Sequence, residues 1–157
     1  MRRRPAVLFV CLGNICRSPL AEAALRSAAS RAGLDIAVDS AGTGNWHVGN
    51  PPDRRAQATA LRHGIDISRL RARQVESADY TRFSHIFALD HDNLRTLRMR
   101  APPNATAEVA LLLDWVAGRV GMSVADPYHG GSADFEKTWQ DVSAAAEALV
   151  ARFSSRA

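Results

Sequence analysis

Apolar residues along the chain fall into two patterns, short unbroken runs and longer stretches with helical spacing. Residues 6–10, Ala-Val-Leu-Phe-Val, form a wholly apolar run that is typical of a strand buried on both faces of a parallel sheet. Small and apolar side chains then recur at helical spacing up to Gly33. Ser18 is the expected N-cap and Pro19 the first helical residue. The pattern therefore predicts a strand, a short loop and a helix.

The same alternation continues to the end of the chain. Further strands are predicted at residues 36–40, 85–89 and 108–112, where a continuation to Trp115 could be helical. Further helices are predicted at about residues 53–63 and 90–99 and from about residue 135. Strands that alternate with helices predict an α/β fold, a single doubly wound domain with a four-stranded parallel sheet and helices on both faces. Ligands bind such sheets beyond the carboxyl ends of the strands, where the strand order reverses.

The loop after the first predicted strand combines residues that suit phosphoryl chemistry. Its form is C-x5-R-S, and its candidate phosphate-binding residues are Leu12, Gly13, Asn14, Ile15, Cys16, Arg17 and Ser18. Backbone N–H groups at a helix N-terminus can surround one phosphate, and Gly13 is expected to permit the unusual dihedral angles. The planar guanidinium of Arg17 can bind two phosphate oxygens.

The same positive surroundings are expected to lower the pKa of Cys11 and make its thiolate a nucleophile. Ser18 could donate a hydrogen bond to the Cys11 sulfur. The alternative, a pair of inert buried cysteines in a tight turn, does not explain the strand, arginine and helix around them. The loop is not a nucleotide-binding P-loop, because no Gly-Lys-Ser/Thr follows Gly13.

The segment VLFVCLGNICRSPLAEA resembles the signature of the low-molecular-weight protein tyrosine phosphatases. Further segments agree in the family's order: SAGT at 40–43, DIS at 66–68 with AR at 72–73, and DPY at 126–128. The resemblance covers nearly the whole chain. It implies one phosphatase domain over residues 1–157 that hydrolyses phosphotyrosine through a cysteinyl-phosphate intermediate.

The resemblance also implies roles for individual residues. Cys11 is the expected nucleophile, Arg17 the phosphate ligand and Asp126 the acid that protonates the leaving oxygen and then activates water. Taken alone, Asp126-Pro127 is only a turn signal. Trp46 and Tyr128 are expected to form aromatic pocket walls, and residues 44–49 to set substrate preference. Besides Asn14, the residues expected to brace the phosphate loop are Ser40 and His63, with a structural histidine as the alternative for His63.

Three other functions share parts of this pattern. Arsenate reductases have the same loop but relay oxidation through later cysteines, and this chain has none after Cys16. Protein arginine phosphatases typically carry threonine where this chain has Ile15, which favours phosphotyrosine. A binding module without turnover is disfavoured by the presence of Cys11, Arg17 and Asp126 together. A reversible Cys11–Cys16 disulfide under oxidant is a further hypothesis.

Charge and composition add little to this picture. The formal net charge is +4, and nineteen of twenty basic residues are arginines spread along the chain, so nucleic acid is not an expected partner. No apolar run approaches the ~20 residues that span a membrane, and the apolar stretch after the basic N-terminus is too short for a signal peptide. We expect a cytoplasmic enzyme, monomeric or weakly dimeric, that acts on phosphotyrosine proteins. We expect no cofactor and no metal, since the consecutive Asp90, His91 and Asp92 cannot all face one ion.

Overall fold

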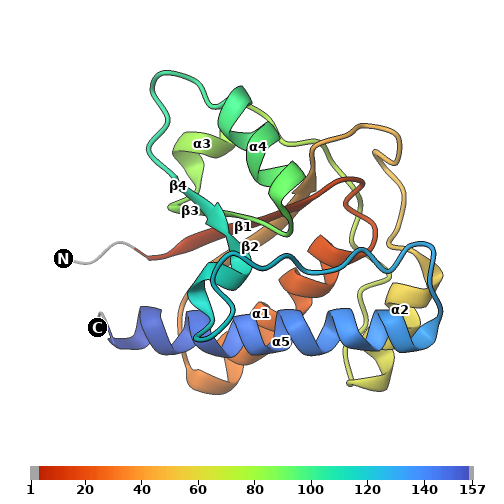
Figure 1. Cartoon of the computed structure of the whole chain (residues 1–157). Coiled ribbons are helices and arrows are strands. Elements are labelled where there is room, and N and C mark those ends of the chain that lie inside the picture. Colours follow the sequence, from red (N-terminus) through yellow and green to blue (C-terminus); the bar gives the residue numbers. More distant parts are fainter. Residues whose placement is uncertain (1–3, 156–157) are drawn as a thin grey trace.

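The sheet has four parallel strands in the order β2-β1-β3-β4, and the computed structural model describes residues 4–155. The strands are β1 (Ala6–Cys11), β2 (Ala37–Gly42), β3 (His85–Ala88) and β4 (Glu108–Leu111). The helices are α1 (Arg17–Ala32), α2 (Arg54–Arg62), α3 (Asp79–Arg82), α4 (His91–Arg100) and α5 (Ser132–Ser155), with a 3-10 turn, η1, at Leu112–Trp115. Helices α1 and α5 lie on one side of the sheet and α3 and α4 on the other (Figure 1). The predicted doubly wound fold is confirmed.

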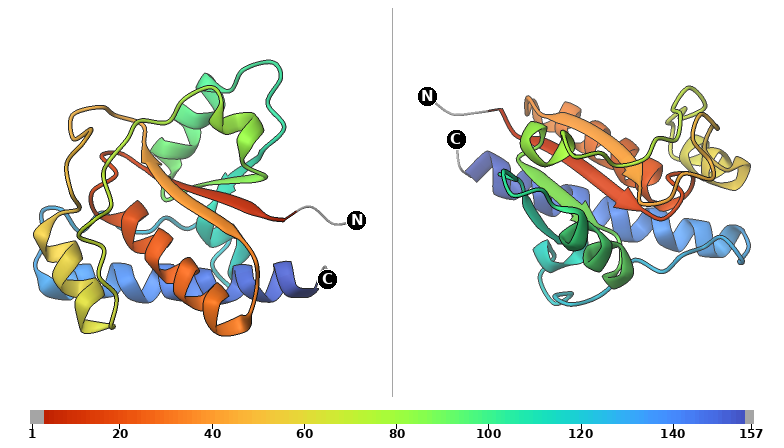
Figure 2. Two further views of the ribbon diagram at one scale, coloured as in Figure 1. Left: turned by 180° about the vertical axis from the view of Figure 1, so that it is seen from behind. Right: turned by 90° about the horizontal axis from the view of Figure 1, so that it is seen from above.

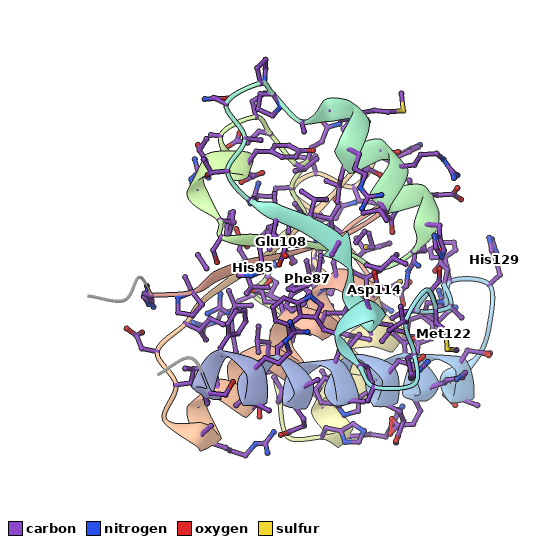
Figure 3. All side chains as sticks on the ribbon, turned by 60° about the vertical axis from the view of Figure 1, so that its left-hand side comes forward. His85, Phe87, Glu108, Asp114, Met122 and His129 are labelled. Atoms are coloured by element: carbon purple, nitrogen blue, oxygen red, sulfur yellow. The ribbon has the colours of Figure 1, made fainter. Side chains whose placement is uncertain are left out.

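Both faces of the central strands are buried, as the unbroken apolar run at the start of the chain predicts. Val7 and Phe9 belong to the core that packs against α1 and α5, whereas Leu8 and Val10 belong to the core beneath α3 and α4. The two layers of helices are seen on opposite sides of the strands in Figure 2. Phe87 in β3 extends the first core toward α5 (Figure 3). Burial of β1 from Val7 to Cys11 fixes the place of the loop that follows it.

The strand order reverses between β1 and β3. Both neighbours of β1 run parallel to it, with Leu8 opposite Asp39 in β2 and Ile86 in β3. The chain moves outward to β2 on one side and to β4 on the other, so the loops after Cys11 and Ala88 meet at the carboxyl edge. This is the position at which doubly wound sheets bind ligands.

The helices differ from the prediction in two places, the start of α1 and the presence of α3. Helix α1 begins at Arg17, and its N-cap residue Cys16 makes no side-chain capping bond. Ser18 does not cap the helix because its hydroxyl is engaged with Cys11 and Asn14. The four-residue helix α3 was not predicted, since four residues are too few to show helical spacing.

No helix within residues 4–155 combines the length and the apolar character that crossing a membrane requires.

Candidate active site

The phosphate loop, residues 11–18, curls between the end of β1 and the start of α1. Asn14 is the one non-glycine residue with a positive φ angle among those that the structure describes, at 58°, and it is 3% exposed. The expectation that Gly13 supplies the unusual backbone angle is therefore wrong. Gly13 instead leaves room for a neighbour, because a Cβ there would lie 2.9 Å from the His47 ring.

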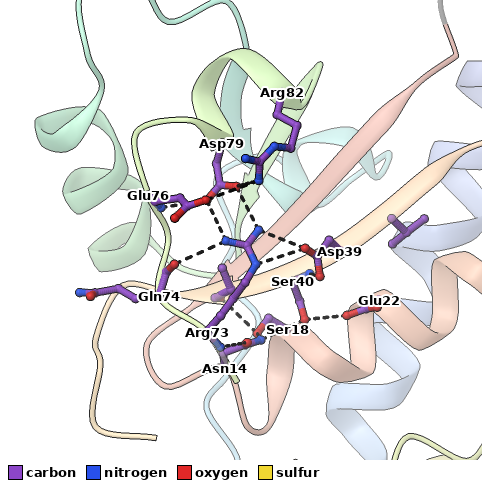
Figure 4. Close-up of polar contacts among 12 residues, drawn as sticks. Asn14, Ser18, Glu22, Asp39, Ser40, Arg73, Gln74, Glu76, Asp79 and Arg82 are labelled. Atoms are coloured by element: carbon purple, nitrogen blue, oxygen red, sulfur yellow. Dashed lines mark hydrogen bonds and ion pairs between the residues drawn. The ribbon is translucent and has the colours of Figure 1, made fainter. Parts of the chain in front are cut away.

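Hydrogen bonds from Asn14 hold the phosphate loop in place (Figure 4). Its amide nitrogen donates to the hydroxyls of Ser18 (2.7 Å) and Ser40 (3.0 Å). Its amide oxygen accepts the backbone N–H of Arg73 at 3.0 Å. Since αL geometry is costly for a residue other than glycine, these three bonds are what stabilise the turn. These bonds join Asn14, inside the loop, to Ser40 in β2, the two residues that the resemblance gave as braces of the loop.

Cys11 lies at the base of the loop, buried, with its sulfur 3.0 Å from the hydroxyl of Ser18. Ser18 is fully buried, so no water competes for this contact. Cys11 also lines the adjoining cavity. Either atom can donate in this contact, so the hydroxyl that was expected to donate to the Cys11 sulfur is within reach of it.

Arg17 is buried although it carries a full charge. Its Nη1 donates to Asp90 Oδ2 at 2.8 Å and to the carbonyl of Val124 at 2.9 Å. Asp90 is itself fixed as the N-cap of α4, where it accepts the N–H of Asn93. Sequence reasoning weighed Asp90 only as part of a metal site, which it rejected; its position directly after the predicted strand at residues 85–89, at the carboxyl edge, was the signal that could have identified it.

Asp126 faces Arg17 from the acid loop, residues 124–130. Its Oδ2 lies 3.8 Å from Arg17 Nη2, and its Oδ1 accepts the N–H of Tyr128 at 3.1 Å. The side chain is 49% exposed, unlike the buried guanidinium opposite. The base of the acid loop is tied to the sheet because Val124 N–H donates to the Leu89 carbonyl. The structure therefore brings Cys11, Arg17 and Asp126 together.

One cavity of about 340 Å³ joins the phosphate loop and the acid loop. Its lining residues are Cys11, Leu12, Gly13, Ile15, Cys16, Arg17, Trp46, His47, Asp126, Tyr128 and His129. Trp46 and Tyr128, the expected aromatic walls, are among the lining residues and are 69% and 42% exposed. His47 and His129 were not predicted, and Figure 3 shows His129 projecting from the acid loop.

Arg55 in α2 braces the acid loop and was missed by sequence reasoning. Its guanidinium binds both oxygens of Asp53 and donates to the carbonyl of Gly130 at 3.1 Å. It also lies 5.5 Å from the ring centroid of Tyr128 and 4.6 Å from that of Phe135. The bond to Gly130 joins residues 75 positions apart, so no local sequence signal reveals it.

Cys16 differs from Cys11 in its surroundings. Burial, with the nearby charge of Asp53 adding to it, raises the pKa of the Cys16 thiol far above its usual value. Both cysteines are free. Cys16 is therefore a neutral thiol in this form, and the proposed disulfide remains a prediction.

The prediction that His63 braces the phosphate loop is wrong. Its Nε2 lies 2.5 Å from Glu136 Oε1, and its ring stacks on Trp139 at 4.9 Å between centroids. Both partners are in α5, so His63 joins α2 to the last helix. The structural alternative holds because the end of α2 points toward α5.

Within residues 4–155, no group of three or more His, Cys, Asp or Glu side chains is placed to hold a metal ion.

Comparison with known proteins gives a consistent result. The family model described as low molecular weight phosphotyrosine protein phosphatase matches residues 6–156. The protein of that name from Schizosaccharomyces pombe is 44% identical over 138 residues, 86% of this chain and 88% of the relative. The low molecular weight protein-tyrosine-phosphatase YfkJ of Bacillus subtilis is 44% identical over 148 residues, 93% and 94% of the two chains.

Comparison with solved structures gives the same result as comparison with sequences. The crystal structure of YfkJ has a TM-score of 0.90 at 41% identity and covers 99% of this chain and 98% of its own. DARP, a Drosophila arginine phosphatase, also has a TM-score of 0.90, at 33% identity, covering 96% and 99%. The chain belongs to the low molecular weight phosphotyrosine protein phosphatase family.

Proposed function

We propose that the chain is a protein-tyrosine-phosphatase that transfers the phosphoryl group to Cys11 and then to water. The observation that carries this proposal is the cavity that Cys11, Arg17 and Asp126 line together, beside a loop with the C-x5-R-S sequence. The family membership supports it independently.

In the first step, the Cys11 thiolate attacks phosphorus and the bond to the tyrosine oxygen breaks. Arg17 and the backbone N–H groups of the phosphate loop stabilise the charge on the three equatorial oxygens. Phenolate is a poor leaving group, so Asp126 donates a proton to the departing oxygen. The 3.8 Å separation between Asp126 and Arg17 supports this role, because the acid stands beside the group that holds the phosphate.

In the second step, water attacks phosphorus of the phosphocysteine and the sulfur–phosphorus bond breaks. Asp126, now a carboxylate, takes the proton from water by microscopic reversibility. The leaving thiolate returns to the place where Ser18 can donate a hydrogen bond to it. Inorganic phosphate then leaves and restores the starting charges.

The pocket walls favour an aromatic phosphate ester. Trp46 and Tyr128 contribute aromatic side chains to the cavity lining, and Ile15 in the phosphate loop contributes an apolar one. The runner-up substrate is phosphoarginine, because an arginine phosphatase shares the fold. We expect Ile15→Thr to raise turnover of a phosphoarginine peptide relative to a phosphotyrosine peptide, measured as the ratio of kcat/KM values.

Further expectations accompany this activity. A reducing compartment protects a catalytic thiol from oxidation, which supports action in the cytoplasm on phosphotyrosine proteins. We still expect the protein to be a monomer or weak dimer, to need no cofactor and not to bind nucleic acid.

The test compares phosphotyrosine, phosphoarginine and phosphoserine peptides of one sequence, without added metal. We expect release of phosphate from the phosphotyrosine peptide by the parent and none by Cys11→Ser. Binding of the phosphotyrosine peptide without turnover by the parent would make the chain a binding module instead. Turnover of phosphoarginine alone would change the substrate class and overturn the interpretation of Ile15.

A further inference from the structure

Glu22 is a buried carboxylate that the proposed mechanism does not use. It lies in the second turn of α1, is 2% exposed, and is turned toward β2 behind the phosphate loop. Its Oε1 accepts the hydroxyl proton of Ser40 at 2.7 Å, as Figure 4 shows. Its Oε2 accepts two bonds from the Arg26 guanidinium, at 2.9 and 3.0 Å. A buried charge is costly, so its retention calls for an explanation.

The directions of the hydrogen bonds near Glu22 can be deduced one by one, beginning at Asn14. The backbone N–H of Arg73 can only donate, so the atom of Asn14 that it contacts must be the amide oxygen. The Arg73 side chain is itself held by the buried carboxylate of Asp79, which keeps this N–H in place. Both protons of the Asn14 amide nitrogen therefore point at Ser18 and Ser40.

Ser40 has one proton, and Glu22 determines where it goes. An ionised carboxylate can only accept, so the Ser40 hydroxyl donates to Glu22. Its lone pairs are thereby left for the Asn14 amide. A donor–acceptor chain polarised in this way strengthens each of its bonds.

Ser18 lies at the other end of this chain of hydrogen bonds, next to Cys11. Its oxygen accepts from Asn14, so its single proton is free for Cys11 Sγ at 3.0 Å or the Ala41 carbonyl at 3.5 Å. The shorter contact is to sulfur, and a hydrogen bond donated to a thiolate favours the charged form.

We propose that Glu22 is a positioning residue for the nucleophile: by accepting the Ser40 proton it strengthens the chain of hydrogen bonds that runs through Asn14 and Ser18 to the Cys11 thiolate. This inference rests on the proposed role of Cys11. It assigns to Glu22 an effect over four hydrogen bonds and no contact with substrate.

Other charged groups lie near Glu22 and near Cys11, the two ends of this chain of hydrogen bonds, and any test must consider them. Glu22 is faced by Arg26 from its own helix and by Asp39 from β2, while burial raises its pKa and the bonds from Ser40 and Arg26 oppose that rise. Asp66 lines a cavity beside it. The ionisable groups that line the cavity together with Cys11 are Arg17, Cys16, His47, Asp126 and His129.

Replacing the carboxylate by an amide changes the polarity with little change of shape. In Glu22→Gln, the amide oxygen is needed by Arg26, which can only donate. The amide nitrogen must then face Ser40 as a donor. The Ser40 proton loses its acceptor and competes with the bond from Asn14, which weakens the support that reaches Ser18 and Cys11.

The experiment measures alkylation of Cys11 by iodoacetamide against pH, with mass spectrometry separating Cys11 from Cys16. We expect Glu22→Gln to raise the pH midpoint and to lower the rate below that midpoint about five-fold. Ser40→Ala should act in the same direction, and the double variant should show no further change, since both act through one chain. Glu147→Gln, which alters a solvent-exposed carboxylate, is the matched control.

The outcomes separate this inference from the proposed function. If alkylation of Cys11 in the parent does not abolish phosphatase activity, the proposed nucleophile is wrong. If it does, but Glu22→Gln keeps the parent midpoint or adds independently to Ser40→Ala, then Glu22 does not position the nucleophile. A lower thermal unfolding midpoint with an unchanged alkylation profile would also overturn the inference, since it indicates a purely structural carboxylate.

Discussion

The phosphate loop and the acid loop line the same cavity but are held in different ways. In the phosphate loop, Asn14, Arg17 and Ser18 are each at most 3% exposed, and each is hydrogen-bonded to other protein groups. In the acid loop, Asp126 is about half exposed; it lies 3.8 Å from Arg17 and accepts a hydrogen bond from a backbone N–H within the same turn. The first loop is thus preorganised, and the second is attached at its ends.

This difference fits the two tasks of the site. Stabilising charge on a phosphoryl group requires donors that are already in place, because reorganising them during the reaction would cost free energy. The acid must first meet a phenolic oxygen and later a water molecule, which an exposed side chain on a short turn can do. The division predicts that substitutions in the phosphate loop act on every substrate, whereas those in the acid loop depend on the leaving group.

The largest effect is expected for Cys11→Ser. A serine hydroxyl at this site is not ionised near neutral pH, so we expect kcat to fall by roughly 10⁴-fold or more with any substrate. Phosphate release from p-nitrophenyl phosphate and from a phosphotyrosine peptide measures the loss. Unequal losses on the two substrates would contradict the division of tasks.

Asp126→Asn tests the acid loop, and the loss of activity that it causes should depend on the leaving group. We expect a loss of about 10²- to 10³-fold on phosphotyrosine but a much smaller loss in the first step with p-nitrophenyl phosphate, whose leaving group needs no proton. Rapid-mixing measurement of p-nitrophenol release separates this step from hydrolysis. An equal loss with both substrates would assign Asp126 to phosphate binding instead.

Arg55→Met tests whether the brace on the acid loop matters for binding. The variant loses the bond to the Gly130 carbonyl and the cation–π contact with Tyr128, so we expect KM for a phosphotyrosine peptide to rise about five-fold with a smaller change in kcat. Arg54→Met, an exposed neighbour in the same helix, is the control. Equal KM values for the two variants would show that the acid loop needs no brace.

The smallest effect is expected for Gly44→Ala at the rim. A Cβ at this position would lie 1.3 Å from the Trp46 ring, so the ring must move away from its place beside the cavity. We expect KM for the phosphotyrosine peptide to rise about threefold while kcat is nearly unchanged. Gly131→Ala adds a methyl group in open space and serves as the control. An unchanged KM would mean that Trp46 does not contact the substrate.

The contrast between the two loops also explains which parts of the site could be predicted from the sequence. The phosphate loop is contiguous, so the order of Cys11, Arg17 and Ser18 identified it, and the apolar run before it predicted the buried strand. Residues that act from a distance were missed: Asp90 is 73 positions from Arg17, and Gly130 is 75 from Arg55. Their roles depend on which loops the sheet brings together.

Sequence rules for helix capping and for backbone angles also failed at residues whose side chains are needed in the site. Ser18 has the sequence signal of an N-cap, but its hydroxyl is used by Cys11 and Asn14, so α1 begins earlier than predicted. Gly13 was expected to adopt the left-handed backbone, which Asn14 adopts instead because three hydrogen bonds hold its side chain. In both cases a polar side chain serves the nucleophile or the loop rather than the helix.

The central claim is that the phosphoryl group passes through Cys11. The most direct test mixes Asp126→Asn with p-nitrophenyl phosphate, stops the reaction with acid after milliseconds to seconds, and locates phosphate by peptide mass spectrometry. The good leaving group allows transfer to sulfur, while the missing carboxylate slows hydrolysis, so we predict that phosphocysteine accumulates at Cys11. Turnover by this variant with no phosphate on Cys11 at any time would contradict the account, because water would then attack the substrate directly.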